Sequence, residues 1–149
     1  MRLPSALLGT ASVYLVYLIG NLLFRRVTVP GLLGALFLAV TLNNVYISRT
    51  GMQEPYVIFF MLLASYFFIK AVITPSTNHY FIWTGVILGL AFLTKYTSFI
   101  LVPIFLTYLA LYKREYFLKK KFWLGAFLSL LIFSPVIIYN VMMYRTVGH

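Results

Sequence analysis

Ionisable side chains are scarce in this sequence, so its possible chemistry is narrow. Only 9% of the 149 residues are charged, and twelve Lys or Arg stand against two acids, Glu54 and Glu115. Cysteine is absent, which excludes disulfides, thiol nucleophiles and Cys-ligated metal sites. Two His and two acids are also too few for a metal site built wholly from this chain. The remaining chemistry is that of a carboxylate and the cations near it.

Glu54 is the carboxylate best placed for such a role. It directly precedes Pro55, which is typical of a first helical turn, and the helix dipole there favours an ionised acid. Arg49 lies shortly before it, and Lys95 lies in a polar break between Thr94 and Tyr96. A carboxylate flanked by two cations could hold a phosphorylated ligand while the acid orients a metal or a hydroxyl. The alternative is that the side chains of both cations only snorkel to the membrane interface and that Arg49 and Glu54 form a surface ion pair.

The elements that position these residues are predicted to be transmembrane helices. The chain is 62% hydrophobic and 19% aromatic, whereas soluble domains have about 25% charged residues and about half apolar ones. Too few polar residues remain for a solvated basic face, so nucleic acid is not an expected partner. We therefore predict an all-α, polytopic transmembrane bundle that forms a single domain over residues 1–149.

Charges, prolines and polar clusters divide the apolar sequence into spans of roughly 20 residues. The clear candidates are residues 7–24, 29–46, 56–73 and 122–144, the last with a predicted kink at Pro135. Residues 80–112 are too long for one span and are broken at residues 94–98. They form either one span with a tail or two short helices that meet at Lys95.

Loop charge favours two short helices, and hence about six segments with the N-terminus outside. One side then carries eight basic residues, which are Arg25, Arg26, Lys70, Lys113, Arg114, Lys119, Lys120 and Lys121. The other side carries four, which are Arg2, Arg49, Lys95 and Arg145. Since basic loops stay in the cytoplasm, we expect a plasma membrane protein whose 113–121 run contacts anionic lipid.

Several segments, in order, resemble the N-terminal membrane half of the GT-C glycosyltransferases related to protein O-mannosyltransferases and aminoarabinose transferases. They are residues 2–9, 46–55 (YISRTGMQEP), 89–97 (GLAFLTKYT) and 134–140. The resemblance covers essentially the whole chain. It implies a membrane enzyme that transfers a sugar from a polyprenyl-phosphate donor to a protein, lipid or glycan acceptor outside the cytoplasm.

The resemblance also implies roles for individual residues. Glu54 matches a second catalytic acid, which in relatives helps to hold a divalent metal or to orient the donor. Arg49 matches the basic position before it, and Lys95 matches a lysine expected to contact the donor phosphate. With the neighbouring Tyr96, Arg49 and Lys95 form the predicted substrate site. A divalent metal is the only cofactor that the resemblance suggests, and no organic cofactor is expected.

The family's principal catalytic acid precedes the segment with which this sequence begins. We therefore expect the chain to be a fragment of a larger GT-C membrane domain and to be inactive on its own. The alternative function is a non-enzymatic lipid-binding or transporter-like membrane module. A helix broken at Lys95 would suit a transporter, but the sequence predicts no second broken segment to mirror it.

Overall fold

The chain is all-helical, as predicted. The computed structural model describes residues 3–24, 27–74 and 79–147, so Arg2, Arg25 and Arg26 lie outside the described residues. The elements in chain order are α1 (Leu3–Leu23), α2 (Val29–Val40), α3 (Leu42–Thr50), α4 (Glu54–Ile73), α5 (His79–Thr94), the 3₁₀ turn η1 (Tyr96–Ile100), α6 (Leu101–Tyr112), the 3₁₀ turn η2 (Arg114–Leu118) and α7 (Lys120–Val147).

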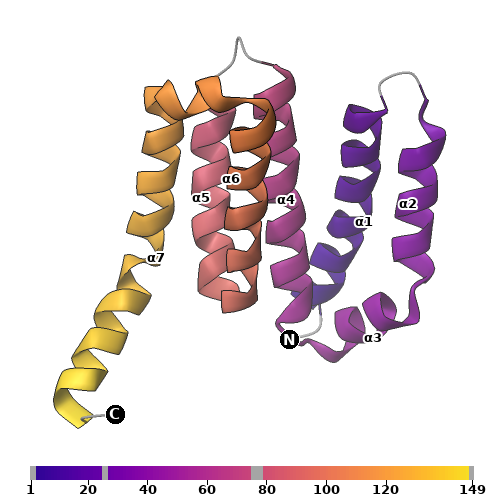
Figure 1. Cartoon of the computed structure of the whole chain (residues 1–149). Helices are drawn as coiled ribbons and strands as arrows, with labels where there is room; N and C mark the ends of the chain where they lie inside the picture. The colour runs from indigo at the N-terminus through magenta and orange to yellow at the C-terminus, as the bar shows by residue number, and fades with distance from the viewer. Residues whose placement is uncertain (1–2, 25–26, 75–78, 148–149) are drawn as a thin grey trace.

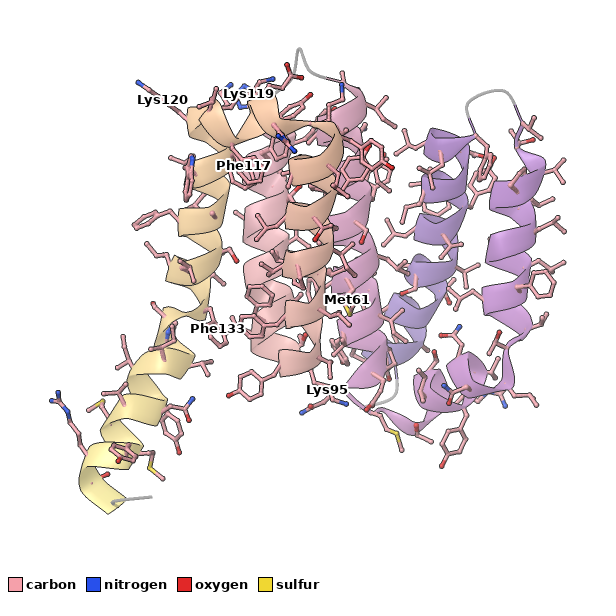
Figure 2. All side chains as sticks on the ribbon, in the orientation of Figure 1. Met61, Lys95, Phe117, Lys119, Lys120 and Phe133 are labelled. Atoms are coloured by element: carbon pink, nitrogen blue, oxygen red, sulfur yellow. The ribbon has the colours of Figure 1, made fainter. Side chains whose placement is uncertain are left out.

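The long helices stand side by side and alternate in direction (Figure 1). α1 packs against α2 and α4, and α5 packs between α4 and α7. One end of the bundle carries α3, the start of α4 and the junction of α5 with α6, and we call it the Glu54 end. The opposite end carries η2 and the start of α7, where Lys119 and Lys120 lie (Figure 2), and we call it the Lys120 end.

The number of membrane spans is smaller than the six segments expected. α1, α4 and α7 are each long and apolar enough to cross a membrane. α2 and α3 together would make a fourth span, but they are bent by 57°. α5 has 16 residues, about 24 Å of helix, which falls short of a bilayer core of about 30 Å. Helix length and hydropathy in the described chain therefore support three to four spans.

The predicted second span, residues 29–46, is interrupted at Thr41. Thr41 is extended (φ −64°, ψ 118°), and its hydroxyl donates to the Phe37 carbonyl at 2.6 Å. The Asn44 amide donates to the Leu38 carbonyl at 3.0 Å. The Asn44 amide thereby satisfies a carbonyl that the end of α2 leaves free, whereas the Phe37 carbonyl also accepts the backbone N–H of Thr41. The expectation that no second segment is broken was therefore wrong.

The predicted meeting of two helices near Lys95 is confirmed. α5 ends at Thr94, and Lys95 is extended (φ −164°, ψ 137°) before η1 begins. Ser98 is buried and its hydroxyl donates to the Ala91 carbonyl at 3.1 Å. Both this break and the one at Thr41 lie at the Glu54 end of the bundle (Figure 1), not midway along it, where the helices of transporters are broken.

α7 carries the predicted proline kink. Pro135 lies inside the helix, and the ribbon bends near Phe133 (Figures 1 and 2). Proline has no N–H for the carbonyl one turn earlier, and the Ser134 hydroxyl donates to that carbonyl, on Leu131, at 2.7 Å.

Close helix packing holds α7 against α5. A Cβ atom at Gly85 of α5 would collide with the backbone of Gly125 in α7. Only residues without a side chain allow this approach, which is typical of small residues at packed interfaces between membrane helices. The contact fixes α5, and hence the position of Lys95 at its end.

Candidate active site

A left-handed turn places Glu54 at the start of α4. Gly51 has φ 71° and ends α3, a conformation that glycine adopts without a Cβ clash. The chain then reverses, and Glu54 begins α4 with the buried Pro55 directly after it. The carboxylate therefore lies beside the free backbone N–H groups of a helix N-terminus, which stabilise negative charge.

Lys95 reaches this carboxylate from the junction of α5 with η1. Its Nζ donates to Oε1 of Glu54 at 3.1 Å, between residues 41 positions apart. The side chains remain 44% and 38% exposed. The predicted meeting of Glu54 and Lys95 at one end of the molecule is thus present as a direct ion pair, and Figure 2 shows Lys95 at that end.

The ion pair forms part of the wall of an open groove between α3, α4 and η1, which we call the Glu54 groove. Its volume is about 420 Å³. Its lining consists of Asn43, Tyr46, Ile47, Met52, Glu54, Val57, Ile58, Lys95 and Thr97. α3 therefore contributes amide and phenol groups that face the carboxylate across a cavity large enough for a small polar ligand.

A second hollow opens on the other side of Lys95, and we call it the Lys95 hollow. Its volume is about 290 Å³. It is lined by Gln53, Phe92, Leu93, Thr94, Lys95, Tyr96 and Val136. Tyr96 is 61% exposed, and its ring stands edge-on to Phe133 with the centroids 6.3 Å apart. Predicted substrate residues Lys95 and Tyr96 thus share one hollow.

Arg49 is placed differently from the other predicted residues. It lies in the last turn of α3 and is exposed. It is absent from the linings of both the Glu54 groove and the Lys95 hollow. Its contact with a donor stays a prediction.

Sequence reasoning missed Met52, Gln53 and Thr97 as lining residues. Each of the three lies one or two positions from Glu54 or Lys95 in the sequence. Because helix ends and turns present successive side chains to one cavity, this proximity was the available signal. Asn43 of α3 also lines the Glu54 groove.

Glu54 has too few neighbours of the right type to hold a metal ion by itself. No group of three His, Asp or Glu residues suitable for a metal occurs among residues 3–24, 27–74 and 79–147. Divalent hard cations take six or more oxygen ligands, whereas Glu54 supplies one carboxylate that Lys95 already contacts. The described donor set therefore does not fit a metal site made by the chain alone.

Comparison with known proteins identifies the family. The family model described as dolichyl-phosphate-mannose-protein mannosyltransferase matches residues 1–139, nearly the whole chain. Comparisons with curated proteins and with solved structures give no significant match. Because the matched region includes both Glu54 and Lys95 along with the helices that carry them, the chain belongs to the dolichyl-phosphate-mannose-protein mannosyltransferase family.

Proposed function

We propose that the Glu54 end of this chain binds the phosphate-linked sugar of a polyprenyl-phosphate donor. Membership of the family implies a membrane glycosyltransferase activity that uses a donor of this kind. The observation that carries the proposal is the Lys95–Glu54 pair, which places a cation and a carboxylate together beside a groove of about 420 Å³.

Lys95 is suited to contact the donor phosphate. An ammonium group has three N–H donors, and the bond to Glu54 uses one of them. Among the residues that the structure describes, no other partner takes the remaining two, which can bind phosphate oxygens. Charge-assisted bonds of this type are about twice as strong as neutral ones. During transfer the phosphate becomes a leaving group and gains negative charge, which a fixed cation stabilises.

Glu54 is suited to orient a hydroxyl at the reacting carbon. In the transfer, an acceptor hydroxyl oxygen bonds to the anomeric carbon as the bond from that carbon to the phosphate oxygen breaks. The phosphate oxygen keeps the electron pair, and the hydroxyl proton passes to a base. The Glu54 carboxylate can accept a hydrogen bond from a hydroxyl in the groove while it holds Lys95 in place.

We further propose that the Glu54 end faces away from the cytoplasm in the plasma membrane. Lys70 and the described basic residues of the 113–121 run lie at the Lys120 end, and such clusters are retained on the cytoplasmic side. A protein, lipid or glycan acceptor would then approach the groove from outside the cell membrane.

The test compares the same substitution at the two ends of the molecule. In the full-length enzyme, Lys95→Gln should lower kcat/KM for sugar transfer by about 100-fold or more, as loss of one transition-state donor does. Lys120→Gln removes an equal charge at the opposite end and should leave transfer unchanged. The protein level in membranes is measured for both variants. If Lys95→Gln lowers protein level and activity in parallel, the residue is structural and the proposal is wrong.

Orientation is tested separately. A Lys95→Cys variant of this cysteine-free chain should react with a membrane-impermeant thiol reagent added outside intact cells. Labelling only after the cytoplasmic side is opened to the reagent would contradict the proposed orientation.

A further inference from the structure

Lys70 is a half-buried cation in the last turn of α4, one of the helices long and apolar enough to cross a membrane. It has no acid beside it in the described part of the chain, where the one ion pair joins Lys95 to Glu54 at the other end of α4. A cation at the edge of the hydrocarbon layer is costly unless polar groups or an anion surround it. The side chains around Lys70 therefore show how its charge is neutralised.

Two tyrosines form a partial cage around the Lys70 ammonium group. Nζ lies 5.2 Å from the ring centroid of Tyr66, on the same helix, and 5.1 Å from that of Tyr80, at the start of the neighbouring α5 (Figure 1). Each ring attracts a cation through its negative face, and the C-terminal end of α4 adds a partial negative charge. None of these groups is a full anion, so the cage positions the ammonium group and leaves part of its charge uncompensated.

The cage also presents hydrogen-bond donors to an anion. The Lys70 ammonium group has three N–H donors, and one of them binds the Tyr66 hydroxyl at 3.2 Å. That hydroxyl accepts the bond, so its own O–H can donate to another group. Tyr80 is half-buried and adds a second phenol. A phosphate group, with several acceptor oxygens and a negative charge, suits this set of donors.

An aromatic surface continues from the cage toward the middle of α4 and α5. Phe67 precedes Lys70 by one helical turn, and its ring centroid lies 6.1 Å from that of Tyr80 and 6.4 Å from that of Trp83. Trp83 is 54% exposed, and Leu90, two turns further along the same face of α5, is 37% exposed. A polar cage near the helix end and an apolar surface deeper in the bundle follow the order of headgroup and acyl chain in a membrane leaflet.

We propose that Lys70, Tyr66 and Tyr80 bind the phosphate of an anionic phospholipid, whose acyl chain lies along Phe67 and Trp83. Charge complementarity selects the anionic lipid. Phosphatidylcholine carries its own quaternary ammonium group, which the Lys70 charge repels, whereas phosphatidylglycerol has a net negative headgroup. This lipid site lies at the end of α4 opposite to the Glu54 groove, and it does not depend on sugar transfer at that groove.

The two tryptophans of the chain provide local probes of bound lipid. Trp83 lies at the proposed site, and Trp123 lies near the start of α7. Trp123→Phe leaves Trp83 as the only indole, and Trp83→Phe leaves Trp123. Each single-tryptophan form of the full chain is reconstituted into phosphatidylcholine nanodiscs that contain equal mole fractions of either brominated phosphatidylglycerol or brominated phosphatidylcholine. Bromine on the acyl chain quenches indole fluorescence on contact, so quenching reports the lipid beside each probe.

Phosphatidylglycerol should be preferred at Trp83 by about fivefold, the factor that corresponds to one basic residue near a charged lipid surface. Lys70→Gln should remove this preference at Trp83 and leave quenching of Trp123 unchanged. Lys120→Gln is the matched control, because it removes an equal charge at the same end of the molecule. It should lower quenching of Trp123 by phosphatidylglycerol and leave Trp83 unchanged. Lys70→Arg keeps a cation and should keep the preference at Trp83.

Two results would overturn the proposal. Equal quenching of Trp83 by the two brominated lipids, in the form that carries only Trp123→Phe, would show that the cage does not select an anionic lipid. This comparison leaves Lys70 intact and so does not depend on the folding of a Lys70 variant. A preference at Trp83 that survives Lys70→Gln but is lost in Lys120→Gln would assign the lipid to the basic residues at the start of α7 instead of to the cage.

Discussion

The two ends of α6 are both 3₁₀ turns, but they manage positive charge in different ways. At the Glu54 end, Lys95 precedes η1 and forms an exposed ion pair with an acid from another helix. At the Lys120 end, η2 is anchored by Tyr116, which is 1% exposed. Lys119 lies over the Tyr116 ring with Nζ 4.0 Å from its centre. Both turns have an aromatic anchor, since Phe99 of η1 stacks on Phe92 with the ring centroids 4.0 Å apart. The difference is that η1 follows a solvent-accessible charge pair that lies beside cavities.

The difference separates stability from function. Tyr116 contacts Phe81 with the ring centroids 5.1 Å apart, and burial raises the pKa of its phenol. The Lys95–Glu54 pair, in contrast, lies in an exposed setting where ion pairs contribute little to stability. Its position beside two cavities is better explained by ligand binding.

The largest stability effect is expected at the core of η2. Tyr116→Ala should lower the free energy of unfolding by about 3–5 kcal/mol, as the loss of a buried aromatic ring does. Tyr112→Ala is the control, because Tyr112 is 72% exposed. Unfolding in detergent, followed by circular dichroism, measures both variants. Equal losses for Tyr116→Ala and Tyr112→Ala would show that η2 is not held by burial.

A smaller effect is expected within η1. Ser98 is buried, and Ser98→Ala removes its hydrogen bond to the Ala91 carbonyl. The expected loss is about 1 kcal/mol, the net contribution of one such bond. Thr107→Ala, at an exposed position of α6, is a matched control that should change stability less. A Ser98→Ala loss as large as that of Tyr116→Ala would remove the contrast between the two turns.

The cations of the Lys120 end should act on lipids instead of on folding. Lys120→Gln should weaken binding of anionic phospholipid by about 1 kcal/mol, the contribution of one basic residue near a charged membrane surface. Native mass spectrometry with phosphatidylglycerol measures the change. Arg145→Gln is the control, because Arg145 lies in the last turn of α7, at the other end of the helix that Lys120 begins. An equal loss for Arg145→Gln would mean that charge number, not position, determines lipid binding.

The sequence predicts some of these features because their causes are local. The break at Lys95 follows from five consecutive residues that interrupt an apolar stretch, and the kink in α7 follows from Pro135. The break at Thr41 was missed because a single threonine between apolar residues does not alter the hydropathy pattern. The Asn44 amide bonds back to the Leu38 carbonyl across this break, six residues earlier, and a hydropathy pattern does not reveal such a side-chain bond.

The candidate site was also predictable only in part from the sequence. Topology alone places Glu54 and Lys95 at one end of the bundle, but it gives no distance. Their 3.1 Å contact requires that α4 and α5 be neighbours, which depends on side-chain packing along both helices. The buried role of Tyr116 was hidden in a run that otherwise reads as a basic loop, although the adjacent aromatics Tyr116 and Phe117 were a signal for it.

The smallest stability effect is expected for the Lys95–Glu54 pair itself, and it gives the sharpest test of the comparison. Glu54→Gln keeps the size of the side chain and removes its charge, so the exposed ion pair is lost without creating a cavity. The unfolding midpoint should not change measurably, because exposed pairs contribute little to folding. Sugar transfer by the full-length enzyme should nevertheless fall, since the groove loses its described carboxylate. A drop in stability as large as that of Ser98→Ala, with transfer retained, would mean that the pair ties α4 to η1 as Tyr116 ties η2 to the bundle. In that case both turns would be structural, and the site would have to be sought elsewhere.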